Sequence, residues 1–139
     1  MKKVMLLLMA IGFMATAVAT KSAFSNKKVC KTSVQTDKNK VCIDACNVCI
    51  ASCKKVEAMC AKEKNTKMAE CEKLCKECVA ACTDCVTAMK ANDAKCKDKC
   101  VACAKICEKC AAECDKFNNA DCKKCAADCR NAAKHCNEM

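Results

Sequence analysis

The sequence contains no proline, tryptophan or tyrosine, and its 139 residues include only one glycine and one histidine. Small disulfide-stapled folds are rich in loops and need glycine and proline for their turns, so this composition argues against them. A single histidine and the lack of a glycine-rich loop leave little with which to build acid–base or phosphate chemistry, so we expect no enzyme. The chain has three phenylalanines and no reading motif, so we expect no nucleic-acid partner despite a formal net charge of +10.

Cysteine is the residue in excess, with 21 copies. A share this high leaves three classes of protein: a disulfide scaffold, a metal–thiolate protein, or both. Most other positions hold Ala, Lys, Glu or Met, which have high helix propensity. The charged residues are scattered between the cysteines, as expected for the solvated faces of helices with ion pairs one turn apart. The length is that of one domain, and we expect this domain to be helical.

Residues 1–19 have the pattern of a secretory signal peptide. Two lysines precede an apolar run over residues 4–18, and small residues lead up to Ala19. We expect cleavage near Ala19, export to the periplasm or the exterior, and no stable membrane insertion afterwards. An uncleaved membrane anchor is the alternative, although the run is short for a span. Cleavage leaves 24 Lys+Arg against 16 Asp+Glu, a net charge of +8. Residues 20–36, with Cys30 among them, form a polar extension that we expect to be disordered.

The other cysteines follow a helical spacing. They form four clusters, and within each cluster consecutive cysteines are 3, 4 or 7 residues apart. This is the a/d pattern of a heptad, which places side chains on one stripe of a helix, whereas a β-strand would need a period of two. The clusters are Cys42, Cys46, Cys49, Cys53 and Cys60; Cys71, Cys75, Cys78, Cys82 and Cys85; Cys96, Cys100, Cys103, Cys107, Cys110 and Cys114; and Cys122, Cys125, Cys129 and Cys136.

Short polar pairs separate the clusters and can cap helices or form turns. Breaks at residues 65–66, 92–93 and 118–119 divide the chain into predicted helices over 37–64, 67–91, 93–117 and 120–138. Because short connections make neighbouring helices antiparallel, the predicted fold class is all-α, an up-down-up-down four-helix bundle over residues 37–139 with a cysteine-lined core. We call the line of a and d positions on each helix its seam. The seam positions that do not hold cysteine are Val56, Met68, Met89, Phe117, Ala132 and Met139.

A core of about twenty thiols packs poorly, because cysteine buries less area than leucine. Thiolate is a soft ligand that favours Cu(I) over the borderline ions Zn(II) and Cd(II). Cβ atoms at i and i+4 on a helix are about 5–6 Å apart, close to the roughly 4–5 Å spanned by a linear S–Cu–S unit. We therefore expect each CxxxC pair to hold one Cu(I). With bridging thiolates, the expected load is about ten to twenty ions per chain.

Two alternatives to copper storage remain open. In a secreted structural protein the core thiols could pair as disulfides across helices, although pairs within one helix rarely meet disulfide geometry and 21 is an odd number. The core could also act as a less selective thiolate buffer for zinc or cadmium. Zinc is disfavoured on geometry, because a continuous ladder of thiols is not expected to bring four ligands to one point.

Written out, the clusters read CIDACNVCIASC, CEKLCKECVAACTDC, CKDKCVACAKICEKCAAEC and CKKCAADC. On helices free of glycine and proline, this pattern resembles the bacterial copper storage proteins, and with the leader it resembles their exported branch. The resemblance covers residues 37–139. It implies storage or sequestration of many Cu(I) ions, homotetramers, and copper uptake past Met and His residues at one end of the bundle. The matching positions are Met89, His135 and Met139. His135 is equally expected as an exposed residue favoured by the helix dipole.

Overall fold

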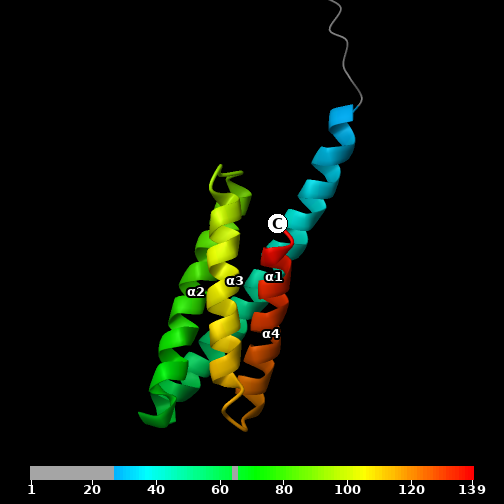
Figure 1. Ribbon diagram of the computed structural model, residues 1–139. Coiled ribbons are helices and arrows are strands. Elements are labelled where there is room, and N and C mark those ends of the chain that lie inside the picture. Colours follow the sequence, from blue (N-terminus) through cyan, green and yellow to red (C-terminus); the bar gives the residue numbers. More distant parts are fainter. Residues whose placement is uncertain (1–26, 64–65) are drawn as a thin grey trace, which may run out of the picture.

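The computed structural model describes residues 27–63 and 66–139, with side chains from residue 34 onward. These ranges form α1 (Lys27–Glu63), a short 3-10 turn η1 (Thr66–Met68), α2 (Ala69–Lys90), α3 (Cys96–Cys114) and α4 (Ala120–Asn137). Helices α1 and α3 each pack against both α2 and α4, so the four helices surround a common core. Successive helices run in opposite directions (Figure 1). The predicted all-α four-helix bundle with a cysteine-lined core is confirmed.

Helix α1 differs most from its prediction. It begins at Lys27, ten residues before the expected start at residue 37, so residues 27–36 are helical and their expected disorder was wrong. No proline or glycine interrupts this stretch, and Gln35 Nε2 donates a hydrogen bond to Asn39 Oδ1 one turn later, at 3.0 Å. Cys30 therefore lies on α1. The predicted signal peptide over residues 1–19 lies outside the described residues.

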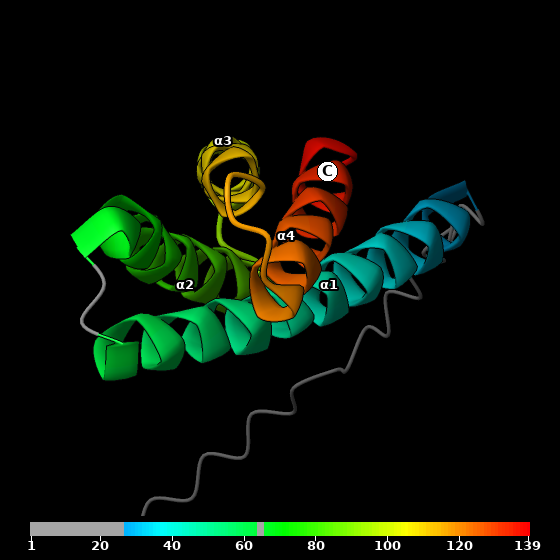
Figure 2. The same ribbon diagram turned by 90° about the horizontal axis from the view of Figure 1, so that it is seen from below.

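The long α1 also shapes the bundle. Its N-terminal part extends past the C-terminal end of α4 (Figure 1), and seen from below it crosses the other helices obliquely (Figure 2). Within the described ranges, no helix is long and apolar enough to cross a membrane.

The connections contain the polar residues from which we predicted them. Asn92 has a φ of 50°, in the left-handed region that asparagine tolerates. Asp93 Oδ1 then accepts a hydrogen bond from the backbone N of Lys95 at 2.9 Å, so α3 begins at Cys96, three residues later than expected. Asn119 caps α4, because its side chain accepts hydrogen bonds from two backbone N–H groups of the first turn, at 2.8 and 3.4 Å. The remaining helix boundaries each lie within three residues of the predicted position: the last residue of α1, both ends of α2, the last residue of α3 and both ends of α4.

Cysteine fills the core. Every cysteine whose side chain is described is buried, except Cys96, which is half-buried. The seam residues Val56, Met68, Met89 and Ala132 are buried with them, as predicted. Phe117 and Met139 are only partly buried and pack against the same cluster.

Sequence reasoning missed a set of core alanines beside the cysteine stripes. Ala104 and Ala111 on α3, and Ala126 and Ala133 on α4, are each at most 3% exposed. Each follows a seam residue by one position and recurs after seven residues, a pattern that could have revealed them. Small side chains at these positions let the helices approach closely, which brings the sulfur atoms of facing helices into contact.

Polar contacts also link the helices. Ser52 on α1, only 5% exposed, donates its hydroxyl hydrogen bond to Asp128 on α4. The same carboxylate accepts a hydrogen bond from Lys124 Nζ at 2.7 Å. Asp84 on α2 pairs with Lys99 on α3 at 3.4 Å, on the exposed surface. Exposed pairs contribute little stability, so the core carries most of it.

Candidate metal centre

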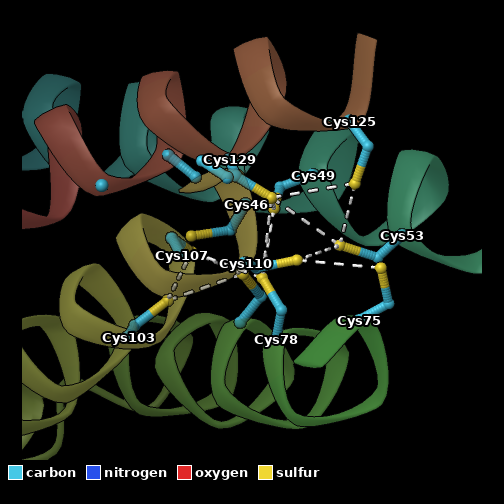
Figure 3. Packing of buried hydrophobic residues seen from close by; sticks show 14 of the residues in the cluster. Cys46, Cys49, Cys53, Cys75, Cys78, Cys103, Cys107, Cys110, Cys125 and Cys129 are labelled. Carbon is cyan, nitrogen blue, oxygen red and sulfur yellow. Dashed lines mark hydrogen bonds between the residues drawn. The ribbon is translucent and has the colours of Figure 1, made fainter. Parts of the chain in front are cut away.

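The cysteine side chains of all four helices point toward one another in the middle of the bundle (Figure 3). Cys49 Sγ on α1 lies 3.4 Å from Cys129 Sγ on α4 and 3.5 Å from Cys78 Sγ on α2. Toward one end, Cys85 Sγ lies 3.4 Å from Cys100 Sγ on α3. A chain of such contacts therefore connects the thiols of different helices along the core.

The predicted unit, a CxxxC pair within one helix, is not the tightest one. The pairs Cys103/Cys107 and Cys125/Cys129 each have their sulfurs 3.9 Å apart, whereas several contacts between helices are 3.4–3.6 Å. The reason is geometric, since Cβ atoms one turn apart are already about 5–6 Å from each other. The unit of the site is accordingly a group of thiols drawn from several helices.

Sets of three or four sulfur atoms lie within 4.8 Å of one another. Three of the four-membered sets have no member in common, and we call them the first, second and third groups. They are Cys42, Cys46, Cys85 and Cys136 (first); Cys49, Cys78, Cys82 and Cys107 (second); and Cys53, Cys75, Cys110 and Cys125 (third). Two further sets each join thiols of two groups with one additional cysteine: Cys49, Cys53 and Cys78 with Cys129, and Cys46 and Cys82 with Cys103. Because the sets overlap, the sulfurs form a connected network, as thiolates that bridge neighbouring ions require.

These groups overturn the geometric argument against zinc. In a tetrahedral site with metal–sulfur bonds near 2.3 Å, the sulfurs are roughly 3.8 Å apart, and the sulfurs of each observed group all lie within 4.8 Å of one another. The expectation that four thiols would not converge on one point was wrong. Each helix does present a continuous row of cysteines, but thiols from three or four helices lie at the same level along the bundle axis and so come together in one group.

Burial keeps thiols of the metal-free core protonated. Removal from water raises the pKa of Cys60 and raises the pKa of Cys100 and of Cys122 to about 12. The opposite shift occurs where a neighbouring S–H stabilises the thiolate, as when Cys114, 3.6 Å away, lowers the pKa of Cys71. A metal ion must displace protons from the buried thiols, so its binding releases protons and weakens in acid.

The arrangement does not favour the disulfide alternative. All cysteines with described side chains are free thiols. Contacts such as the 3.4 Å between Cys85 Sγ and Cys100 Sγ are far longer than a disulfide bond of about 2.05 Å.

The residues assigned to copper uptake gather at one end of the bundle. His135 and Met139 line a surface pocket of about 280 Å³. Met139 also lines a second pocket with Met89 and Cys96. Cys96 is thus at the edge of the core and not within it. His135 Nδ1 lies 3.2 Å from Glu138 Oε2, and the thiol groups given above do not include His135. Its metal role stays a prediction.

A four-helix bundle whose core is a connected network of buried thiols defines a class: a metal–thiolate protein that holds several soft ions at once. Comparison with known proteins identifies the family within this class. A family model described as copper storage protein (Csp) matches residues 34–139. The chain therefore belongs to the copper storage protein family, a family of non-enzymatic Cu(I)-binding proteins.

Two solved structures are similar to this chain. The Cu(I)-bound copper storage protein BsCsp3 is 33% identical with a TM-score of 0.70, and the match covers 73% of this chain and 97% of that one. Apo copper storage protein 3 from Bacillus subtilis is also 33% identical with a TM-score of 0.67, and the match covers 72% and 96% of the two chains. No curated protein matches. The prediction of multiple Cu(I) ions as cargo is confirmed.

Proposed function

We propose that this protein stores Cu(I) in an exported compartment, takes ions up at the end of the bundle that carries Met89, His135 and Met139, and passes them inward along the thiol network. The observation that carries the proposal is the continuity of that network. From Cys100 inward, the sulfurs that a moving ion would visit in turn lie within 4 Å of each other, so a new thiolate can bind before the old one leaves.

The first steps of this path can be followed from the uptake end. Cys96 lines the pocket that also contains Met89 and Met139, and Cys100 lies one helical turn deeper on α3. From Cys100 the next sulfur is Cys85, at 3.4 Å. Cys85 in turn lies 3.9 Å from Cys136, which belongs to the first group. Each transfer exchanges one thiolate ligand of Cu(I) for another and needs no change of oxidation state.

Charge favours a heavily loaded core. A Cu(I) ion held by two thiolates carries one negative charge, and an isolated buried charge is expensive. Loading toward one ion per thiolate makes the core neutral, because each Cu(I) then replaces one proton. At partial loading, the net +8 of the chain without its leader offsets the negative core. We therefore expect a capacity of about ten to twenty ions, nearer to the upper value when copper is abundant.

The location and assembly belong to the same proposal. The leader pattern over residues 1–19 supports export, and the family resemblance supports a homotetramer. N-terminal sequencing of the protein made by its own cell should give a first residue close to Thr20, and light scattering after gel filtration should give four times the chain mass. An intact N-terminus in the cytoplasm would contradict export, and a monomer at working concentration would contradict the tetramer.

Storage is tested by adding Cu(I) anaerobically to the reduced protein in the presence of a chromogenic Cu(I) chelator. The chelator should stay copper-free until about ten to twenty ions per chain have been added. Saturation below about four ions would defeat storage. Protein whose thiols have been alkylated provides the control and should bind almost nothing.

The uptake end is tested by the double variant His135→Ala and Met139→Ala. Loading should become slower while the final capacity is unchanged, because neither residue belongs to the thiol groups described above. The matched control is Met59→Ala on α1, which lines a pocket with Asp121 from the first turn of α4, at the opposite end of the bundle. Equal loading rates in both variants would place uptake elsewhere.

A further inference from the structure

We propose that, before copper arrives, this protein holds three Zn(II) ions, one in each of the first, second and third groups. These groups have no member in common, so all three can be filled at once. Together they use twelve thiols, and each group supplies four sulfur ligands to one ion. The inference uses the same thiols as copper storage, but zinc binding and copper capacity can each fail without the other.

The third group has the clearest geometry for such an ion. It takes one thiol from each helix: Cys53 from α1, Cys75 from α2, Cys110 from α3 and Cys125 from α4. Cys53 Sγ lies 3.5 Å from Cys125 Sγ and 4.0 Å from Cys110 Sγ, and Cys75 Sγ lies 3.7 Å from Cys110 Sγ. A tetrahedral tetrathiolate site has edges of roughly 3.8 Å. Small side-chain rotations would therefore complete the site, and the bound ion would cross-link all four helices.

The chemistry of the groups fits zinc in a closed site. Each of the twelve thiols is fully buried or, for Cys136, 1% exposed, so no coordination position is open to water, as in structural zinc centres. Binding follows Zn²⁺ + 4 RSH → [Zn(SR)₄]²⁻ + 4 H⁺. Three such centres carry a charge of −6, which the net +8 of the chain without its leader exceeds. The surface charge thus matches a zinc-filled core as well as a partly copper-filled one.

Copper would displace this zinc without any electron transfer. In each group, [Zn(SR)₄]²⁻ + 4 Cu⁺ → Cu₄(SR)₄ + Zn²⁺, so every sulfur keeps its negative charge and exchanges one metal for another. The exchange removes two buried negative charges per group, and thiolate prefers the softer ion. Zinc would serve as a place-holder that keeps the thiols together and unavailable for oxidation until Cu(I) replaces it.

Cobalt(II) provides the spectroscopic probe, because tetrahedral cobalt thiolates absorb strongly in the visible. The reduced full-length protein is titrated anaerobically with Co(II), then with Zn(II), and finally with Cu(I). We expect the tetrahedral bands to reach their end point at three ions per chain. Zn(II) should then bleach the bands, and in a sample not given zinc Cu(I) should bleach them while releasing cobalt.

Single variants show whether the groups are the sites. Cys110→Ser and Cys75→Ser, both in the third group, should each lower the end point to two ions, and Cys85→Ser in the first group should do the same. Cys96→Ser, outside the three groups, should leave it at three. An end point other than three in the wild type, an absence of tetrahedral bands, or an end point unchanged in both third-group variants would each overturn the proposal. The Cu(I) capacity of the same samples reports on copper storage separately.

Discussion

Replacing Cys78 and Cys82 with serine should lower the copper capacity by a small, countable amount and leave the fold intact. Cys78 Sγ has three neighbouring sulfurs at 3.5–3.9 Å, and Cys82 Sγ has two at 3.5–3.6 Å. None of these neighbours depends on Cys78 or Cys82 for all its contacts within the connected network. Two thiolates fewer therefore remove one to two ions from about ten to twenty, according to whether each ion uses two thiolates or one.

The cost to the metal-free fold can also be worked out. A buried hydroxyl without a partner costs roughly 1–3 kcal/mol, but a helical serine can donate to the carbonyl one turn before it. Thr83 already does so on α2, donating to the Val79 carbonyl at 2.7 Å. We expect about 1 kcal/mol per substitution, and so a fall in Tm of roughly 8 °C for the double variant.

The assay is a paired Cu(I) titration of wild type and variant, with circular dichroism to confirm equal helix content. Cys60→Ser with Cys122→Ser, near the other end of the core, is the matched control and should also remove one to two ions. If the Cys78/Cys82 variant lost more than half of the capacity, copper would bind cooperatively around these thiols and the reasoning from a redundant network would be refuted. An unchanged capacity would show that they are not ligands.

Three further predictions concern stability. The Tm of the metal-free protein should fall as pH rises from about 9 to about 12, because Cys100 and Cys122 keep their protons in the fold to about 12, against an ordinary pKa of 9.0, while the unfolded chain loses them first. Below pH 9 this contribution is fully present, and the copper-loaded protein, whose thiols have already lost their protons, should show little change in a scanning calorimeter. Asn119→Ala removes the cap of α4 and should cost about 1 kcal/mol in urea unfolding, whereas Asn119→Asp should cost less; equal losses would argue against the cap. Val56→Ala leaves a cavity at a fully buried site and should lower the free energy of unfolding by about 2 kcal/mol. A decrease below about 0.5 kcal/mol would mean that the thiol core is too loosely packed for the cavity to affect stability.

The periodic part of the structure could be predicted from the sequence. Spacings of three and four between cysteines fix the face of each helix, so the burial of Cys46, Cys78 or Cys125 followed from the pattern alone. The polar pairs between clusters located the connections, and Asn119 caps its helix as expected. These features depend on residues close together in the chain, where geometry is set locally.

What could not be predicted is the register between helices. Cys49 meets Cys129, at 3.4 Å, because of how far α1 is shifted along α4, and that shift depends on packing and on connection geometry. For the same reason the sequence predicted a common core of thiols but not the convergence of four of them on one point. The start of α1 was missed because polar residues such as Gln35 and Asn39 carry no hydrophobic period, although their side chains support the helix.

Anomalous diffraction at the copper edge, from crystals of the Cu(I)-loaded protein, shows whether the buried thiols are the copper store. We expect a row of copper peaks inside the four helices, each at about 2.3 Å from cysteine sulfurs, with peaks in the first, second and third groups. Copper confined to the surface around His135, with the thiols of the core unoccupied or bonded to one another, would contradict it.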